Sequence, residues 1–235
     1  MTEEIEGVKY EYGFEQGSLD WMKARKGIIT GSNVKHIITP TLKIANNDKT
    51  RTYVCQLISD RVTDFIVEDQ YLSWDMMRGK EDEILARALY SETWDDVEEC
   101  GFITNGSLGF KAGHSPDGLV GDDGMLEIKS RLSQLQVKAV MQDLIEGRVP
   151  KEDMLQVQAG LLISGREWCD YVVYSRGLPM VKVRAVPMPD VHEAIIEAGL
   201  VTDASVVAGV DKYKDFVKDF PMTKYVPFTG DEIKV

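Results

Sequence analysis

Residues 115–129 contain a short motif in which two acidic residues and one lysine lie on either side of a tight turn. The motif reads Ser-Pro-Asp-Gly-Leu-Val-Gly-Asp-Asp-Gly-Met-Leu-Glu-Ile-Lys. Its last part, residues 126–130, is predicted to be a β-strand. Because side chains alternate between the two faces of a strand, Glu127 and Lys129 point the same way, roughly 6.6 Å apart along the strand axis. The motif therefore commits this part of the chain to a sheet with a charged pair on one face.

The turn within this motif predicts that a second carboxylate lies next to Glu127. Asp117 belongs to a Pro-Asp-Gly turn, which fixes its backbone and exposes its carboxylate. The Asp122-Asp123-Gly124 turn lets the chain double back as a hairpin and brings Asp117 beside Glu127. Oxygen ligands of this kind suit Mg²⁺ or Mn²⁺ rather than zinc. A bound ion can activate a water and stabilise charge on a phosphate, and Lys129 can position or deprotonate that water or hold the developing charge.

The same pattern has an ordinary structural interpretation. Asp-Gly turns are common in loops, and a Glu-x-Lys strand is also what a solvated sheet edge contains. The motif alone leaves both interpretations open, so the rest of the chain has to decide between them.

The charge of the chain at first argues against a nucleic-acid partner, because the net charge is −12. The acidity is uneven, however: residues 60–100 hold thirteen acids against four bases, a net −9, and the remainder is close to balanced. Basic residues gather at two places, Lys23, Arg25 and Lys26, and Lys129, Arg131 and Lys138. The composition is therefore compatible with a DNA-binding groove on an acidic body.

The cysteines and histidines are scattered along the chain: Cys55, Cys100, Cys169, His36, His114 and His192. This pattern predicts reduced thiols in a cytosolic protein and disfavours a zinc site or a histidine-based nuclease. No apolar run approaches 18 residues, so no membrane span is expected. The acidic beginning of the chain lacks the pattern of a signal peptide, which also favours the cytoplasm.

Apolar spacing predicts the following helices and strands. Helices are expected at 21–24, 33–38, 52–67, 76–90, 133–146, 152–163 and 191–216. Strands are expected at 101–104, 110–114, 126–130, 168–175 and 181–188. The order of helix, three strands, helix and two strands indicates an α/β fold with a mixed central sheet flanked by helices. We expect a single domain over 1–235, with its core at about 15–190 and a C-terminal helical region and tail at 191–235.

Several details of these helices can be tested against a structure. Ser32 is predicted to be the N-cap of the helix at 33–38. The helix at 76–90 is expected to leave Asp82 in solvent and to bury its apolar residues Ile84, Leu85, Ala88 and Leu89. The long C-terminal helix is expected to break near Gly199 or Gly209.

Two further positions suit the same chemistry as the motif. Glu83, on the helix at 76–90, can aim a carboxylate at Asp117 and Glu127. Gln156 and Gln158 lie two positions apart on a later helix, about 200° of rotation, so only one of them can face the site. The alternatives are an ordinary surface acid and ordinary helical surface residues.

Arg25 and the segment Thr30-Gly31-Ser32 form a candidate phosphate clamp. Arginine supplies a planar fork of donors, and a helix N-terminus at Ser32 adds backbone amides and the positive end of the helix dipole. The alternative is that Arg25 is a surface charge and Ser32 only a helix cap.

Taken in order, these motifs resemble the phage lambda exonuclease family, also described as YqaJ-like viral recombinases, within the PD-(D/E)xK nuclease superfamily. The resemblance covers roughly residues 15–175. It rests on Trp21-x-x-x-Arg25-x-Gly27-Ile28-Ile29-Thr30-Gly31-Ser32, Gly79-x-x-x-Glu83, Ser115-Pro116-Asp117-Gly118, Leu126-Glu127-Ile128-Lys129 and Gln156-Val157-Gln158. Each motif is weak alone, but five in order are specific, and they disfavour the ordinary interpretation of the opening motif.

The resemblance implies a PD-(D/E)xK core and a processive 5′-to-3′ exonuclease on linear double-stranded DNA. Such an enzyme starts at 5′-phosphorylated ends, releases mononucleotides and leaves a 3′ overhang for recombination by strand annealing. The resemblance also implies two Mg²⁺ ions, for which Mn²⁺ can substitute. Their ligands would be Glu83, Asp117, Glu127 and the backbone carbonyl of Ile128, and Lys129 would act on the nucleophilic water.

Further roles follow from the resemblance only. The 5′-phosphate would be held by Arg25, Ser32, Ser115 and Gln158. The partners would be double-stranded DNA ends, two further copies of the chain in a ring-shaped homotrimer, and a single-strand annealing protein, all in the cytoplasm of a bacterial host that carries the phage or prophage. Residues 40–75 do not align clearly with the family. A strand-separating wedge is expected near residues 72–77, with Met76 or Met77 as candidates and core packing as the alternative.

Two other functions compete with this one. A restriction-type or RecB-like endonuclease would use the same fold, but the Arg25 and Ser32 motif favours recognition of an end over recognition of a site. No Gly-x-x-x-x-Gly-Lys-Ser/Thr sequence is present, which disfavours an attached ATP-driven motor of that type. A non-catalytic DNA-binding protein on a decayed nuclease fold is disfavoured by the joint presence of Asp117, Glu127 and Lys129.

Overall fold

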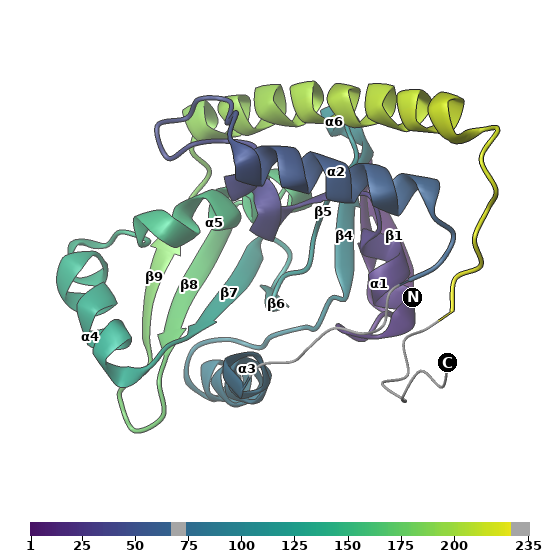
Figure 1. The fold of residues 1–235 in the computed structure, drawn as a ribbon. Coiled ribbons are helices and arrows are strands. Elements are labelled where there is room, and N and C mark those ends of the chain that lie inside the picture. The colour runs from purple at the N-terminus through teal and green to yellow at the C-terminus, as the bar shows by residue number, and fades with distance from the viewer. Residues whose placement is uncertain (67–73, 227–235) are drawn as a thin grey trace.

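A computed structural model of the protein, which describes residues 1–66 and 74–226, has mixed α/β architecture with its strands in two hydrogen-bonded sheets (Figure 1). The first sheet has the order β1-β2-β4-β5-β3, and its strands are β1 (Thr2–Ile5), β2 (Val8–Glu11), β3 (Ile29–Thr30), β4 (Phe102–Asn105) and β5 (Ala112–His114). The second has the order β6-β7-β8-β9, with β6 (Gly118–Val120), β7 (Gly124–Ser130), β8 (Trp168–Tyr174) and β9 (Val181–Ala185). The predicted α/β fold is confirmed, and its sheet is divided in two.

The division falls within the opening motif. The chain leaves the first sheet at His114 and enters the second at Gly118, so Ser115, Pro116 and Asp117 form the link. Pro116 has no backbone N–H to donate to a ladder, which suits a position between strands. Residues 118–120 were not predicted as a separate strand because three residues are too few to show a period. The link places Asp117 at the junction of the two sheets.

Both sheets contain parallel and antiparallel pairs. In the first, β3 runs parallel to β5 and the other pairs are antiparallel. In the second, β7 and β8 are parallel, while β6–β7 and β8–β9 are antiparallel hairpins. The connection between the parallel strands carries α4 (Ser133–Gln142), the 3-10 turn η3 (Leu144–Glu146) and α5 (Lys151–Ser164), as a parallel crossover requires.

The remaining helices cover the sheets. They are α1 (Leu19–Arg25), α2 (Asp48–Val62), α3 (Trp74–Thr93) and α6 (Pro189–Val217), with the short 3-10 turns η1 (Gly31–His36) and η2 (Gly106–Leu108). Figure 1 shows α2 and α6 running side by side over one side of the molecule, with α3 on the other side of the strands. No helix within the described ranges is both long and apolar enough to cross a bilayer.

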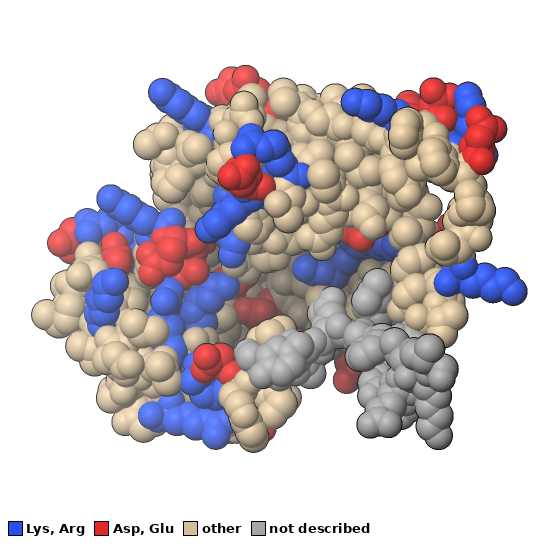
Figure 2. Space-filling model, in the orientation of Figure 1, with Lys and Arg blue, Asp and Glu red and all other residues tan. Residues whose placement is uncertain are grey.

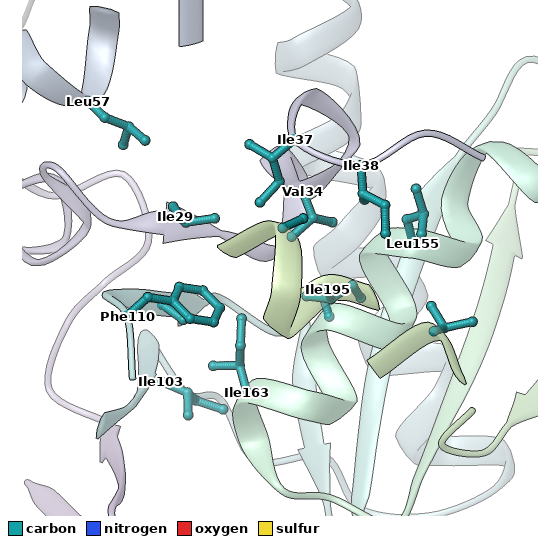
Figure 3. Close-up of a cluster of buried hydrophobic side chains, with 14 of the residues drawn as sticks. Ile29, Val34, Ile37, Ile38, Leu57, Ile103, Phe110, Leu155, Ile163 and Ile195 are labelled. Atoms are coloured by element: carbon teal, nitrogen blue, oxygen red, sulfur yellow. The ribbon is translucent and has the colours of Figure 1, made fainter. Parts of the chain in front are cut away.

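The buried helix α5 holds the two halves of the core together. Leu155, Ala159 and Ile163 pack into the cluster formed with η1, β4 and α6, which Figure 3 shows in close-up. Val157 and Leu161, on the opposite side of the helix, pack against β7 and β8. A helix that is apolar on both sides belongs inside the fold, and α5 therefore fixes where its polar residues point.

The orientation of α3 differs from the sequence expectation. Ile84, Leu85, Ala88 and Leu89 are exposed, and the buried face instead carries Asp82, Ala86 and Tyr90. Asp82 is buried because Ser130 Oγ and Arg176 Nε donate hydrogen bonds to its carboxylate, each at 2.6 Å. The Tyr90 hydroxyl donates to Asp170 Oδ2 at 2.7 Å. Hydrophobicity predicted the wrong buried face for this helix, because the face that is buried contains polar groups whose partners lie elsewhere in the chain.

The expected break in the C-terminal helix is absent, since α6 runs unbroken for 29 residues. A Cβ atom on Gly199 would lie 2.4 Å from Phe110, and one on Gly209 would lie 2.3 Å from Ile58. The two glycines thus allow close packing against the rest of the protein instead of ending the helix.

The cap expected at Ser32 is also wrong. The turn η1 begins one residue earlier, at Gly31, with Thr30 in the N-cap position and no side-chain cap bond. The hydroxyl of Thr30 instead accepts a hydrogen bond from Asn33 Nδ2 at 2.9 Å.

Candidate active site

The hairpin expected from the opening motif is present and brings Asp117 beside Glu127. Gly118 pairs with Leu126 across β6 and β7, and the Asp117 N–H donates to the Leu126 carbonyl at 3.1 Å. The Ile128 N–H in turn donates to Asp117 Oδ2 at 2.6 Å. Backbone bonds on both sides of Glu127 therefore fix the position of Asp117.

Glu127 and Lys129 lie on the same face of β7 and contact each other. Lys129 Nζ lies 2.7 Å from Glu127 Oε1. The side chain of Gln156, on α5, closes a triangle with this pair. Its Nε2 donates to Glu127 Oε1 at 2.5 Å, and its Oε1 accepts from Lys129 Nζ at 3.0 Å. The amide thus holds the carboxylate and the amine in one relative position.

The structure decides which glutamine faces the site, and it is Gln156. Gln158 is buried and its amide binds the segment before α6. Its Nε2 donates to the Val186 carbonyl at 2.9 Å, and its Oε1 accepts from the Met188 N–H at 2.8 Å. Both ends of this amide already have partners, so its placement argues against the expected contact between Gln158 and a phosphate. The residue pattern left the choice between Gln156 and Gln158 open because the rotation of α5 depends on its packing, and the family resemblance favoured Gln158.

The carboxylate of Glu127 is only half satisfied. The residue is 2% exposed, and within the described residues its Oε2 atom is buried without a hydrogen-bond partner. The same is true of His114 Nε2, which lies 3.9 Å away. A buried carboxylate oxygen without a donor is costly, so this atom is suited to a cation that is not part of the chain.

The pKa values of Asp117, Lys129 and His114 are all shifted by their surroundings in the site. Burial raises the pKa of Asp117 well above its ordinary value, and the carboxylates of Glu127 and Glu83 raise it further. Burial alone would lower the pKa of Lys129, but the charge of Glu127 outweighs it and raises that pKa, so the amine is an ammonium. Burial, with Arg25 and Lys129 nearby, lowers the pKa of His114 to about 3, which leaves the imidazole neutral.

Glu83 lies close enough to feel this cluster but is tied to another partner. Arg87 Nη2 lies 2.5 Å from Glu83 Oε1, and Arg87 Nη1 lies 2.6 Å from Glu99 Oε1. Burial raises the pKa of Glu83 despite Arg87, and the charge of Glu127 adds to the rise. Across residues 1–66 and 74–226, no three His, Cys, Asp or Glu side chains stand close enough together to hold a metal by themselves.

Arg25 and Ser115 meet next to this cluster. Arg25 Nη1 donates to Ser115 Oγ at 2.9 Å, and Trp21 Nε1 donates to the same oxygen at 2.8 Å. The Arg25 guanidinium lies over the Trp21 ring, with Cζ 4.2 Å from the ring centroid. Burial lowers the pKa of Arg25 to about 10, which still leaves it positive. A cavity of about 500 Å³ adjoins it, lined on other sides by Lys26, Thr30, Asn33 and Tyr53.

The other expected DNA contacts are less defined. Ser32 lies on η1 with its Oγ 3.4 Å from Thr30 Oγ1, and no hydrogen bond joins it to Arg25 or Ser115 in the described part of the chain. Met76 and Met77 are exposed in the first turn of α3. Residues 72 and 73 of the expected wedge segment lie outside the described residues.

The charges around the site are arranged in layers. Figure 2 shows a hollow between α3 and the helices opposite, with Lys and Arg side chains on its walls and acidic side chains deeper in it. A basic rim over an acidic floor suits a polyanion that is held at the rim while a cation binds at the floor.

The sequence and the fold were compared with those of known proteins. The sequence profile described as "YqaJ-like viral recombinase domain" matches residues 20–167. The structure of an alkaline exonuclease (LHK-Exo) from Laribacter hongkongensis superposes with a TM-score of 0.74 at 28% identity, covering 87% of this chain and 100% of that one. Its complex with dAMP gives the same values. A search of curated proteins finds no match.

A more distant structure shares the fold alone. A phage related exonuclease from Haemophilus somnus 129PT superposes with a TM-score of 0.54 at 10% identity, covering 79% of this chain and 96% of that one.

Proposed function

This chain belongs to the YqaJ-like viral recombinase domain family and is a nuclease, and we propose that it is a Mg²⁺-dependent 5′-to-3′ exonuclease on linear double-stranded DNA. It would begin at 5′-phosphorylated ends, release mononucleotides and leave a 3′ overhang for recombination by strand annealing. The observation that carries the proposal is the cluster of Glu127 and Lys129 on β7 with Asp117 just before β6, next to Arg25 and Ser115.

The residues of the cluster fit a divalent cation. Among the described residues, Glu127 Oε2 is buried without a donor, and the pKa of Asp117 is raised first by burial and then by neighbouring carboxylates whose charge a cation would offset. The oxygen donors suit Mg²⁺, with Mn²⁺ as a substitute. We propose that Asp117, Glu127, the backbone carbonyl of Ile128 and Glu83 hold two such ions. For Glu83 this requires release from Arg87, which binds it at 2.5 Å.

The side chains of the site divide the work of hydrolysis. When bound, the metal supplies a nucleophilic water and stabilises charge on the scissile phosphate. Lys129 is an ammonium held between Glu127 and Gln156, so it can donate hydrogen bonds to the attacking water or to a phosphate oxygen. Gln156 keeps this ammonium and Glu127 in register. Because the Lys129 amine is already protonated, it cannot accept a proton from the water. It could act as a base only if a bound cation first lowered its pKa.

Arg25 and Ser115 are proposed to bind the 5′-phosphate of the shortened strand, with Ser32 beside them. The guanidinium is buried against Trp21 and remains charged, which makes it a stronger partner for a phosphate than an exposed arginine. Ser115 is two residues from Asp117 in the chain, so a phosphate bound there would lie near the proposed cutting site. This spacing would select for ends that already carry a phosphate.

Several further roles rest on the family alone. We propose that the chain works as a ring-shaped homotrimer that encloses DNA, alongside a single-strand annealing protein, in the cytoplasm of a bacterial host of the phage or prophage. Met76 or Met77 is proposed as the strand-separating wedge. Light scattering coupled to gel filtration checks the trimer: a mass of one chain, about 26.4 kDa, would contradict it.

The function is tested with two DNA substrates in Mg²⁺. Linear duplex with 5′-phosphates and closed circular duplex are incubated with the protein, with chelator as the control. Loss of the linear DNA alone, with release of mononucleotides, is the expected result. Nicking or cutting of the circle would instead favour a restriction-type or RecB-like endonuclease. Binding without hydrolysis of either substrate would favour a non-catalytic DNA-binding protein.

A further inference from the structure

The end of β5 carries a buried histidine that the proposed chemistry does not use. His114 is the last residue of this strand and is 2% exposed. It lies three residues before Asp117, and its side chain is buried with Nε2 3.9 Å from Glu127 Oε2. A polar ring in this position needs a reason, because an apolar residue would fill the same volume at lower cost.

Two glycines from distant parts of the chain make room for this ring. A Cβ atom on Gly31 would lie 2.5 Å from His114 Nδ1, and one on Gly160 would lie 2.8 Å from His114 Nε2. Real Cβ atoms do not approach so closely, so any other residue at either position would push the ring aside. The ring therefore sits in a slot between η1 and α5 that fixes its direction.

In this slot the ring faces the unsatisfied oxygen of Glu127. His114 Nε2 and Glu127 Oε2 are 3.9 Å apart, and among the described residues both atoms are buried and lack a hydrogen-bond partner. That distance is too long for a hydrogen bond, and a shift of about 1 Å would make one. Oε1 of the same carboxylate already has Gln156 and Lys129 as partners.

We propose that His114 is a positioning residue for Glu127, whose Nε2–H donates to Oε2 and holds the carboxylate in its metal-binding orientation. A carboxylate oxygen has two lone-pair directions and can accept this bond while it binds a cation with the other. Gln156 and His114 would then hold the two oxygens of Glu127 from two sides. Hydrogen bonds to metal ligands of this kind strengthen metal affinity by about 10- to 100-fold. The inference rests on the proposed role of Glu127 as a metal ligand.

The test measures metal affinity without DNA, by titration calorimetry of the whole protein with Mn²⁺. His114→Met, which removes the donor at similar volume, is expected to weaken Mn²⁺ binding about 10-fold or more. His114→Gln, which can restore an N–H near the position of Nε2, is expected to recover most of the affinity. Unchanged affinity in His114→Met, or equal loss in both variants, would overturn the proposal.

Two further variants separate positioning from packing. Met125 Cε lies 2.7 Å from the same hypothetical Gly160 Cβ, so Met125→Leu disturbs the slot without touching a donor and should leave Mn²⁺ affinity unchanged. Gly160→Ala displaces the ring without removing it and should weaken Mn²⁺ binding as His114→Met does. Thermal melting in chelator shows whether His114→Met is folded. If it is not, the Mn²⁺ affinity of Gly160→Ala tests the proposal instead. A loss in Met125→Leu as large as that in Gly160→Ala would contradict the proposal.

Failure of the proposed function would look different. If the wild-type protein binds Mn²⁺ but does not digest linear duplex, the exonuclease proposal fails, and the inference about His114 is still decided by the Mn²⁺ affinities of the variants. If wild type digests DNA and the His114 variants keep full Mn²⁺ affinity, only the inference fails.

Discussion

The two faces of the second sheet each bury a carboxylate, and they treat it in opposite ways. Asp170 on β8 pairs in register with Leu126 and faces α3, whereas Glu127 is the next residue along β7 and faces α5. Burial alone would raise the pKa of Asp170, but hydrogen bonds from Arg184, Lys182 and Tyr90 outweigh it and lower that pKa. On the other face, the carboxylates lie close together, and within the described residues Glu127 has one oxygen without a donor.

The difference separates a carboxylate that its own chain fully pairs from one that its own chain leaves partly unpaired among the described residues. Tyr90, Lys182 and Arg184 all bind the Asp170 carboxylate, so its charge is paired within the chain. These contacts also connect β8 and β9 to α3. Among the described residues, the Glu127 face has the Lys129 ammonium beside the two acids Asp117 and Glu127, which is the setting in which we propose that a cation binds. A buried acid is thus better judged by its partners than by its burial.

The largest expected effect comes from the lysines of the two faces. Lys129→Ala should lower the rate of duplex hydrolysis by about 10³-fold or more, roughly 4 kcal/mol of transition-state stabilisation, while DNA binding stays largely intact. Lys182, which pairs with Asp170, is the matched control, and Lys182→Ala should keep near wild-type activity. The measurement is single-turnover cleavage with saturating Mg²⁺. Near wild-type cleavage by Lys129→Ala would defeat the role given to that amine.

The next effect is on stability and has opposite signs on the two faces. Asp170→Asn should lower the free energy of unfolding by about 2 to 3 kcal/mol, because it removes a charged acceptor shared by three donors, two of which can still reach water. Asp117→Asn should leave it unchanged or raise it, because it removes a carboxylate that its neighbours disfavour. Urea denaturation in chelator measures both. Equal losses in the two variants would erase the distinction between the faces.

A smaller effect is expected on the choice of DNA end, at the proposed phosphate pocket beside the Glu127 face. Arg25→Ala should reduce the preference for 5′-phosphorylated over 5′-hydroxyl ends by about 10-fold, roughly 1.4 kcal/mol, because the phosphate loses its buried guanidinium. Arg184→Ala, on the Asp170 face, serves as the control and should keep the preference. Equal digestion of both ends by the wild type would already contradict the phosphate pocket.

The smallest effect is a dependence of stability on pH. The folded pKa of Asp117 is raised above its ordinary value of 3.8, so the folded state binds more protons than the unfolded state above that pH. Its contribution to stability is therefore present at low pH and is lost as pH rises toward the folded pKa. For Asp170 the pKa is lowered, so its contribution is present above about pH 3.8 and is lost as pH falls.

These slopes can be measured by thermal melts in chelator across pH. Asp117→Asn should gain on wild type as pH rises above about 4, and added Mg²⁺ should reduce that gain, since the ion offsets the repulsion between carboxylates. A constant difference between the two proteins at all pH values would show that Asp117 titrates as an ordinary acid.

What could be read from the sequence was local in the chain. Alternation along a strand put Glu127 and Lys129 on one face, and the Asp122-Asp123-Gly124 turn put Asp117 beside them. The α/β order followed from periods of a few residues, and the family followed from five short motifs in order. The strand, the turn and each single motif depend on neighbours within about a dozen positions, where spacing alone fixes geometry.

The tertiary structure decided whatever depends on how elements pack. Hydrophobicity predicted the wrong buried face for α3, because Asp82 and Tyr90 are buried with partners from other elements. The sequence left Gln156 and Gln158 open, since the rotation of α5 is set by two apolar clusters on opposite sides of it. Arg25 and Ser115 meet across 90 residues, a contact that no local period encodes. The slot of His114 likewise needs Gly31 and Gly160, which come together only when β5, η1 and α5 pack against each other.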